Sequence, residues 1–287
     1  MHTPRSTRPS TTVAAPRPET LSRVVTFALL VVLALASALG AAPAVARELP
    51  ADPLRSVMWK SMAERFLPDG EIVFDERVRV LAPLSAEDQV NVPVTVDATA
   101  LDDVTEIVAF ADLNPIPLVL RARPEGAAPF LGFRLKLQQS SPVHVGVRTG
   151  DGTWHVAGVI IDAAGGGCTA PAMAHGTSDW MSTLGETRAQ VRRGVDGEAR
   201  MSLRIRHPMD TGLASGIPVF YLEELTVRDA DGETLMALSL YEPVSENPTL
   251  TLKPRVGTGS GTLEVSTRDT EGNVFAFPLE VPAAGDS

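Results

Sequence analysis

The sequence predicts an all-β protein built from two β-sandwich domains. Short apolar runs with alternating polarity recur through residues 72–161 and again after residue 197. Glycine-containing turn signals separate these runs at the spacing typical of a sandwich. The predicted divisions are 1–46 as a signal peptide, 47–168 as the first sandwich, 169–196 as a linker and 197–287 as the second sandwich.

In the first domain, a short helix should precede the strands. Residues 54–66 carry apolar side chains at helical spacing, and Asp52-Pro53 before them provide an N-cap and a first-turn proline. The apolar positions are Leu54, Val57, Met58, Met62 and Phe66. We expect this amphipathic helix to pack on the first sandwich.

Strand alternation in the first domain is clearest at two places. Val92, Val94 and Val96 share one face of a predicted strand. Residues 131–137 repeat the pattern, with Arg134 and Lys136 expected to point outward. The inward positions are Leu131, Phe133, Leu135 and Leu137. Thr149-Gly150-Asp151-Gly152 then predict a hairpin turn.

The second domain shows the same alternation over about ninety residues, which is enough to hold its own core. Met201, Leu203 and Ile205 mark its first strand, and residues 229–232 and 270–273 predict two of its turns. The linker before it contains scattered glycines, and a connection of this length is usually functional or a tether. Within the linker, residues 178–193 could form a short helix.

The N-terminus predicts export to the periplasm. Four arginines precede an uncharged apolar run at residues 24–39, and Ala44-Val45-Ala46 follow as a small-x-small cleavage signal. An uncleaved membrane anchor is the alternative, although the run is shorter than the ~20 residues of a spanning helix. Cleavage after Ala46 leaves 241 residues with a net charge near −13. Such acidity argues against nucleic acid or anionic membranes as partners and allows docking on basic proteins.

The only cysteine ends a run of three glycines, Gly165-Gly166-Gly167-Cys168. Glycines have no side chain to bury and lose the most conformational entropy on ordering. An unpaired cysteine in an exported protein also needs an explanation. We therefore interpret Cys168 as a solvent-accessible thiol presented on a glycine arm, Gly165 to Gly167. The alternative is an inert thiol in a glycine-rich loop.

The other candidate site residues are histidines. His175 is the nearest potential general base for Cys168, and no basic residue lies within seven positions on the N-terminal side. His144 and His155 fall on predicted neighbouring strands, so a two-histidine metal site is conceivable. We expect His207 in the HPM run to hold structure, by capping or hydrogen bonding, and not to bind a metal. We expect no catalytic site, no metal and no cofactor other than an adduct on Cys168.

Several motifs resemble the sulfur-carrier proteins SoxY and SoxZ. Asn114-Pro115, the hairpin FRLKLQQSSPVHVGVRTGDGTWHVAG and the GGGC arm resemble SoxY. RIRHPMDTG (204–212), Ile217-Pro218 and SENP (245–248) resemble SoxZ. The fused order is similar to SoxYZ-like carriers found alongside quinoprotein alcohol dehydrogenases. The resemblance implies two immunoglobulin-like sandwiches packed together, which we expect to meet face to face. It also implies a cysteine that carries a sulfur or other small adduct between periplasmic oxidation enzymes of cytochrome or quinoprotein type.

The sequence departs from this family at the arm, which in the sulfur-oxidation carrier is a free C-terminus. Here Thr169-Ala170-Pro171 and a whole domain follow Cys168, so the thiol lies in a tethered loop and thiosulfate chemistry is left open. Three hypotheses remain: a covalent carrier, a non-covalent structural or interaction module of a dehydrogenase complex, and a thiol enzyme or redox sensor. The lack of an activating neighbour counts against the third, and the glycines count against the second.

Overall fold

The computed structural model describes residues 48–194 and 198–284. The predicted signal peptide lies outside the described residues. Leu49 and the described residues after it form one compact unit. Within this described part, no helix is long and apolar enough to cross a membrane.

The helix α2 spans Trp59–Phe66 and begins later than Asp52-Pro53 predicted. The Asp52 carboxylate accepts hydrogen bonds from the backbone amides of Leu54 and Ser56, at 2.9 and 2.7 Å. It therefore caps a turn and not a helix, and Arg55 takes a positive φ of 55° that interrupts helical geometry. The expected packing is confirmed, because the helix buries its apolar face in a cluster with Phe110 and Trp154 of the first domain. Val57, however, is 88% exposed.

Eight strands follow α2 in the first domain, and their alternation matches the sequence pattern. Val92, Val94 and Val96 are buried on one face of their strand, as predicted. The strands are β1 (Ile72–Phe74), β2 (Arg79–Leu81), β3 (Val92–Asp97), β4 (Val104–Ala111), β5 (Leu118–Arg123), β6 (Ala127–Leu135), β7 (Ser141–Thr149) and β8 (Trp154–Ile161). Gly152, with a φ of 89°, supplies the left-handed residue of the β7–β8 turn.

Between β8 and the second domain, the helix expected within 178–193 is absent from the structure. Two 3-10 turns, η1 (Met173–Gly176) and η2 (Trp180–Thr183), lead directly into a strand, β9 (Thr187–Arg193). A strand forms because each residue of β9 pairs with β10 (Ala199–Ile205) in an antiparallel ladder. The remaining strands are β11 (Asp210–Thr211), β12 (Val219–Phe220), β13 (Leu222–Arg228), β14 (Thr234–Leu240), β15 (Thr249–Pro254), β16 (Gly261–Asp269) and β17 (Val274–Val281).

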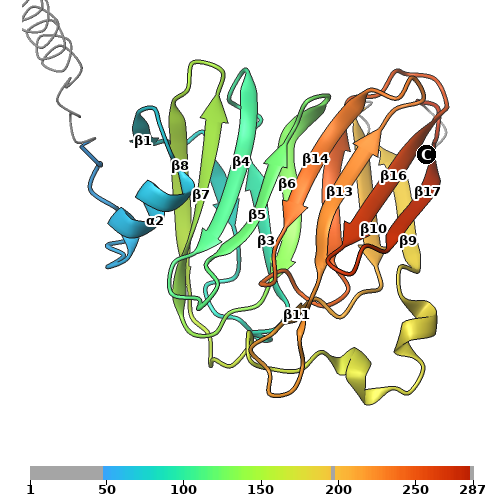
Figure 1. The fold of residues 1–287 in the computed structure, drawn as a ribbon. Helices are drawn as coiled ribbons and strands as arrows, with labels where there is room; N and C mark the ends of the chain where they lie inside the picture. The colour runs from blue at the N-terminus through green and yellow to red at the C-terminus, as the bar shows by residue number, and fades with distance from the viewer. Residues whose placement is uncertain (1–47, 195–197, 285–287) are drawn as a thin grey trace, which may run out of the picture. The chain divides into compact units, whose positions relative to one another are not determined.

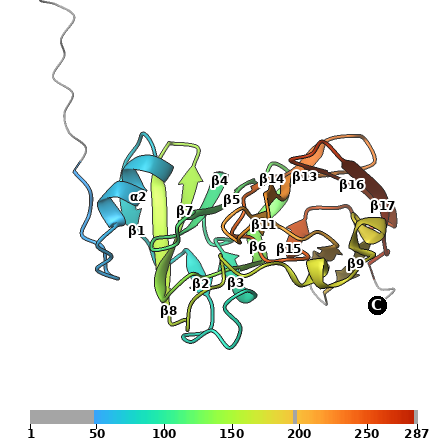
Figure 2. The same ribbon diagram turned by 60° about the horizontal axis from the view of Figure 1, so that its bottom comes forward.

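The strands form two large layers that both run through the junction between the domains (Figures 1 and 2). The nine-stranded sheet has the order β1-β8-β7-β4-β5-β14-β13-β16-β17, and the six-stranded sheet has the order β2-β3-β6-β15-β10-β9. At the junction, β5 pairs with β14 and β6 pairs with β15, both antiparallel. One hydrophobic core continues between the layers from Val78 to Val281.

The sandwiches therefore join edge to edge, and the expectation of face-to-face packing is wrong. An edge strand presents unpaired backbone N–H and C=O groups, and pairing with another edge satisfies them. The ladders of β5–β14 and β6–β15 satisfy these groups from both domains at once. The mostly-β, sandwich-like fold is confirmed, and its two halves are continuous in both sheets.

Candidate functional site

The glycine arm is packed against the connection between β6 and β7. The amides of Gly166 and Gly167 donate to the carbonyls of Gln138 and Leu137, both at 3.0 Å. Gly165 and Gly166 have φ values of 105° and 87°. A Cβ at Gly167 would lie 2.3 Å from the carbonyl oxygen of Gln89, so only glycine fits this approach. The glycines thus allow the arm to pack closely on other backbone, whereas the sequence analysis expected an arm that presents the thiol to solvent.

Cys168 is buried, with 0% of its surface exposed, so the prediction of an accessible thiol is wrong for this conformation. Its amide donates to Oε1 of Gln138 at 3.1 Å, and its carbonyl accepts from Oγ1 of Thr211 at 2.6 Å. Its Sγ lies 3.7 Å from the carbonyl oxygen of Lys136. Burial raises the pKa of the thiol to about 11, although the Lys136 ammonium acts in the opposite direction. In this state the sulfur is a neutral, protected thiol at neutral pH.

Lys136 lies near the thiol, and the sequence analysis predicted its exposure wrongly. It was expected to point outward, yet it is only 5% exposed. Its Nζ donates to the carbonyl oxygens of Met209 and, at 3.4 Å, Glu242, both in the second domain. Burial lowers the pKa of Lys136 to about 8. A charged amine held by carbonyls across the domain junction is therefore the nearest source of positive potential for Cys168.

Asn114 fixes the backbone that surrounds the thiol. Its side-chain amide donates to the Lys136 carbonyl at 2.8 Å, and its Oδ1 accepts from the Gln138 amide at 2.9 Å. Asn114 is buried, and its bond to the Lys136 carbonyl is shielded from water. The Asn114-Pro115 motif therefore has a structural role in shaping the site.

The HPMDTG run (residues 207–212) supplies the second-domain side of the site. Nδ1 of His207 accepts from the Met209 amide at 3.1 Å, which supports the positive φ of Met209, 52°. The same Met209 offers its carbonyl to Lys136, while Thr211 bonds to Cys168. The predicted structural role of His207 is confirmed. Burial lowers the pKa of His207 to about 4.

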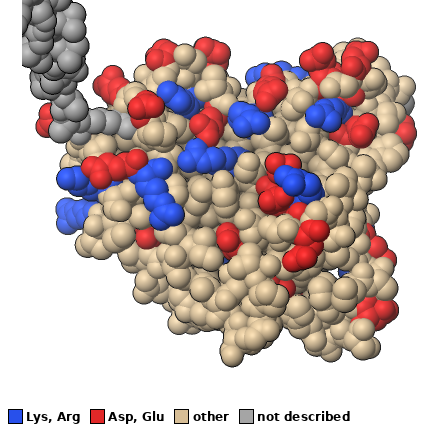
Figure 3. Space-filling model, viewed as in Figure 1, with Lys and Arg blue, Asp and Glu red and all other residues tan. Residues whose placement is uncertain are grey.

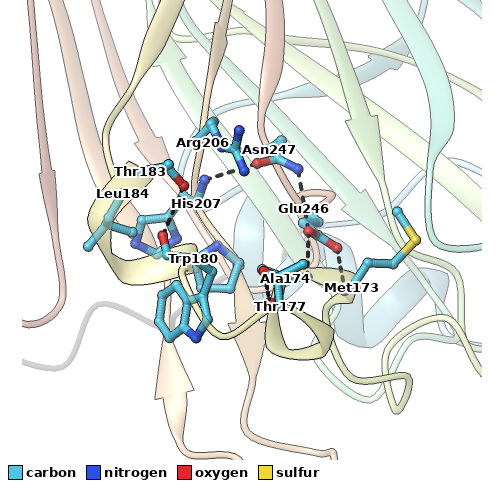
Figure 4. Close-up of a pocket in the computed structure, with 11 residues that line it drawn as sticks. Met173, Ala174, Thr177, Trp180, Thr183, Leu184, Arg206, His207, Glu246 and Asn247 are labelled. Carbon is cyan, nitrogen blue, oxygen red and sulfur yellow. Dashed lines mark hydrogen bonds between the residues drawn. The ribbon is translucent and has the colours of Figure 1, made fainter.

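Residues 165–184, called here the cysteine segment, are also held further along by the second domain (Figure 4). Glu246 accepts hydrogen bonds from the amides of Met173 and Ala174, at 2.7 and 3.1 Å. His175 Nε2 lies 2.9 Å from Oδ2 of Asp210. Within the described part of the chain, Asp210 and not Cys168 is therefore the hydrogen-bonding partner of His175, and the geometry does not support it as a base for the thiol.

A hollow of about 220 Å³ lies between the cysteine segment and the end of β10. Trp180, Met173, His207 and Asn247 are among the residues that line it, as Figure 4 shows. In Figure 3, the lower end of the molecule, where Figure 1 places β11 and the 3-10 turns, carries few charged side chains. The site thus lies at an end of the sandwich with little surface charge in this view.

His144 and His155 do not form a pair. In the register of β7 and β8, His144 lies opposite Gly158 and His155 lies opposite Val147, so the two histidines occupy opposite faces of the sheet. His144 contacts Asp112 and Asp52, whereas His155 contacts Asp75. Among the described residues there is no group of three or more His, Cys, Asp or Glu that could hold a metal ion.

Two family models match the chain in tandem, and together they define a protein built from two sulfur-oxidation domains. Residues 63–168 match "Sulfur oxidation protein SoxY", and residues 189–277 match "Sulphur oxidation protein SoxZ". The chain is therefore a fused SoxYZ-like protein, with a SoxY domain that ends at Cys168 followed by a SoxZ domain. The resemblance predicted from the sequence is confirmed.

Solved structures similar to this chain include the sulfur carrier protein SoxY from Chlorobium limicola f thiosulfatophilum. It is 23% identical over 37% of this chain and 94% of its own length, with a TM-score of 0.32. The fibronectin(III)-like modules of Clostridium thermocellum CbhA are 8% identical over 72% of this chain and 94% of theirs, with a TM-score of 0.22. None of the curated proteins compared with the chain matches it.

Proposed function

We propose that this chain is a periplasmic covalent carrier that holds a sulfur-containing or other small adduct on Cys168. It presents that adduct to partner enzymes of cytochrome or quinoprotein type, in a sulfur-oxidation or quinoprotein-dehydrogenase-linked system. The observation that carries the proposal is that the SoxY match ends at Cys168, on three glycines. A carrier thiol borrows its catalytic groups from its partners, so the chain needs no catalytic site of its own.

The buried position of Cys168 is the resting state of this carrier. Loading requires the thiolate, and a pKa of about 11 leaves almost none at neutral pH. Release of the cysteine segment breaks the bonds of Cys168 to Gln138 and Thr211 and returns the thiol to water. There its pKa falls towards the ordinary value of about 8.5. The segment therefore protects the thiol when no partner is bound.

The loading step that needs no external oxidant is exchange with a persulfide or disulfide held by a partner enzyme. The Cys168 thiolate attacks one sulfur, and a new S–S bond to Cys168 forms as the partner's S–S bond breaks. The electron pair leaves with the departing sulfur, which becomes a thiolate. Unloading reverses the step on the next enzyme, so the carrier itself is neither oxidised nor reduced overall.

The attachment of the cysteine segment at both ends limits which partner enzymes can accept the thiol. The cysteine segment is joined to β8 at one end and to β9 at the other, so the thiol emerges on a loop and not on a free tail. A partner cleft must therefore accept two strands of backbone. Trp180 and Met173, on the same segment, would enter or border that cleft with the thiol.

The burial of Cys168 favours a second candidate function, a non-covalent structural or interaction module of a periplasmic dehydrogenase complex. A buried cysteine packs as a small hydrophobe and needs no reactivity. Under this alternative, the cysteine segment is a fixed part of the junction between the two domains. The two functions make opposite predictions for removal of the sulfur.

Cys168→Ser tests the carrier function. A serine hydroxyl fits the same space and can donate to the Lys136 carbonyl, so the variant should fold and melt close to wild type. We expect it to lose all substrate turnover by the associated periplasmic oxidation system. Met181→Ser is the matched control, since it removes an exposed sulfur from the same segment and should remain active. If the Cys168→Ser protein is folded and fully active, the carrier function is wrong and the interaction module is the remaining function.

A further inference from the structure

The outer face of β9 and β10 carries four exposed arginines in two facing pairs. In the antiparallel register, Arg188 lies opposite Arg204 and Arg192 lies opposite Arg200. Directly opposed residues in such a ladder share one face of the sheet. Val191, Met201 and Leu203, which alternate with them along the strands, point to the other face and are buried in the core. We call the two pairs the arginine rungs.

Each rung places like charges directly across the ladder, which destabilises an antiparallel pair. Within the described part of the chain, none of the four arginines forms an ion pair with a carboxylate. Arg192 donates to Oε1 of Gln190 at 3.3 Å, and Arg200 lies 5.2 Å from the ring centre of Phe130. The fold therefore keeps two repulsive pairs, each of which one acidic substitution would relieve.

Neighbouring basic residues on the same sheet show that carboxylates are available nearby. Arg206 lies 3.8 Å from Glu186, and Lys253 lies 2.8 Å from Glu198. Among the described residues, the arginines of the rungs have no such carboxylate partner, in a chain whose formal net charge is −10. Their positive charge is thus concentrated on one face, opposite in sign to the chain as a whole.

The spacing of the rungs limits what can bind to both. They are four residues apart along each strand, which corresponds to about 14 Å at the usual rise of ~3.4 Å per residue. A small oxyanion can neutralise only one rung. The rung formed by Arg188 and Arg204 opens into a hollow of about 450 Å³. The hollow is also lined by Arg206, Asn247 and one carboxylate, that of Glu186, so arginines outnumber carboxylates in it three to one.

We propose that the arginine rungs are a docking surface for an acidic partner protein that presents carboxylates about 14 Å apart. Arginine forks bind carboxylates through two parallel hydrogen bonds, so each rung can hold one or two of them. Between the rungs stand Ser202 and Gln190, with no exposed aromatic ring for stacking bases.

One of the two strands that carry the rungs, β10, leads to the cysteine site. Arg204 lies three residues before His207, which begins the HPMDTG run, and this run holds Cys168 through Thr211. In Figure 1, β9 and β10 lie in the layer behind β16 and β17, so Figure 3 shows the opposite face of the molecule. A partner bound to the rungs would lie beside the end of the sandwich where the thiol is released. The docking itself requires no thiol chemistry and is independent of the proposed carrier function.

Fluorescein-labelled poly-L-glutamate is the probe, and its anisotropy is followed as mature protein is added at low and at physiological salt. We expect wild-type protein to bind more weakly as salt is added. Arg188→Glu/Arg192→Glu should weaken binding by about tenfold or more. The control Arg55→Glu/Arg228→Glu makes the same charge change at two exposed sites away from the rungs and should change affinity by less than about twofold.

The melting temperature is a second measurement, and it distinguishes a loss of docking from a loss of folding. Each reversal places opposite charges across a rung, so the variant should melt at or above the wild-type temperature. If it fails to fold, Arg188→Gln/Arg192→Gln is measured in its place, with the same loss of affinity expected. Three results would overturn the proposal: no binding of polyglutamate by wild type, an equal loss in the control, or equal or tighter binding of duplex DNA or anionic vesicles.

Discussion

Two segments that lie outside the regular strands are held on the sandwiches by different kinds of contact. The N-terminal segment, residues 49–58, is held by a buried charged cluster in which His144 lies between Asp52 and Asp112, at 3.1 and 2.9 Å. Asp112 also accepts a short hydrogen bond from Ser56. The cysteine segment is held mainly by single hydrogen bonds to backbone groups, including those of Gln138 and Thr211 with Cys168.

The difference in exposure indicates which segment can be released. The side chains of His144, Asp112 and Asp52 are at most 4% exposed. In the cysteine segment, Met173 is 79% exposed and the side chain of His175 is 27% exposed. A buried ionic cluster costs several kcal/mol to break, whereas each neutral hydrogen bond that holds the cysteine segment contributes about 1 kcal/mol. Under the proposed function, the first contact acts as a permanent anchor and the second, at the cysteine segment, acts as a latch that can open.

The largest expected effect comes from breaking the anchor. Asp112→Ala leaves a buried imidazole without its closer carboxylate, so the free energy of unfolding should fall by about 3 kcal/mol. Urea unfolding measures this loss. The exposed pair of Lys60 and Glu64 is the matched control, and Glu64→Ala should cost less than about 0.5 kcal/mol. Equal effects would mean that the buried cluster is not an anchor.

A change that keeps the cysteine segment from closing should alter the reactivity of Cys168 far more than the stability of the fold. The Cβ of Gly167→Ala meets carbonyl oxygens of Gln89 and Leu137 at 2.3 and 2.5 Å, so the arm cannot close. Since the pKa of Cys168 falls from about 11 towards ~8.5, alkylation by a small maleimide at neutral pH should accelerate by about a hundredfold.

Gly176→Ala is the control for this variant. It adds a Cβ to the same segment, at a site with nothing within 4 Å, and should leave the alkylation rate unchanged. A wild-type thiol that already reacts as fast as a free model thiol would refute the closed latch. So would a Gly167→Ala protein with unchanged protection.

The smallest expected effects are on folding stability as a function of pH, and they have opposite directions for His144 and His207. Burial alone would lower the pKa of His144, but its hydrogen bond to Asp112 and the charges of Asp112 and Asp52 raise it above its usual value. The stability that His144 contributes is therefore complete below about pH 6.5 and is lost as pH rises through the raised pKa. His207, with a pKa of about 4, contributes stability that is lost as pH falls from ~6.5 to 4.

Urea unfolding of His144→Gln and His207→Gln beside wild type between pH 4 and 9 separates these slopes. The stability advantage of wild type over His144→Gln should shrink on the alkaline side. Its advantage over His207→Gln should shrink on the acidic side. Slopes of the reverse sign would contradict the assigned charge states.

The strands could be predicted because their burial follows a local alternation that the sequence displays. Val92, Val94 and Val96 are buried as their spacing indicates, and the turn at Gly152 falls where Asp-Gly predicts it. The edge strand β9 was missed because its outer positions are arginine and glutamine and only its pairing with β10 makes it a strand. The start of α2 was misplaced because Asp52 caps a turn equally well.

The state of the cysteine site was predicted wrongly. The glycines were interpreted as a free arm that presents Cys168, yet glycine also allows backbone to approach backbone, as Gly167 does at Gln89. Lys136 could not be found from local pattern, because its partners Met209 and Glu242 come from the other domain. Contacts across the junction depend on the edge-to-edge pairing of the sheets, which no local pattern encodes.

Intact-mass analysis of the protein isolated from its native periplasm tests the carrier function most directly. The chain should be harvested while the cells oxidise their substrate, and then alkylated after unfolding. The carrier function predicts a fraction with added mass that maps to Cys168 and disappears on treatment with a thiol reductant. The Cys168→Ser chain, purified in parallel, should lack that mass. A wild-type population in which Cys168 is always an unmodified thiol, even during active oxidation, would contradict the function proposed here.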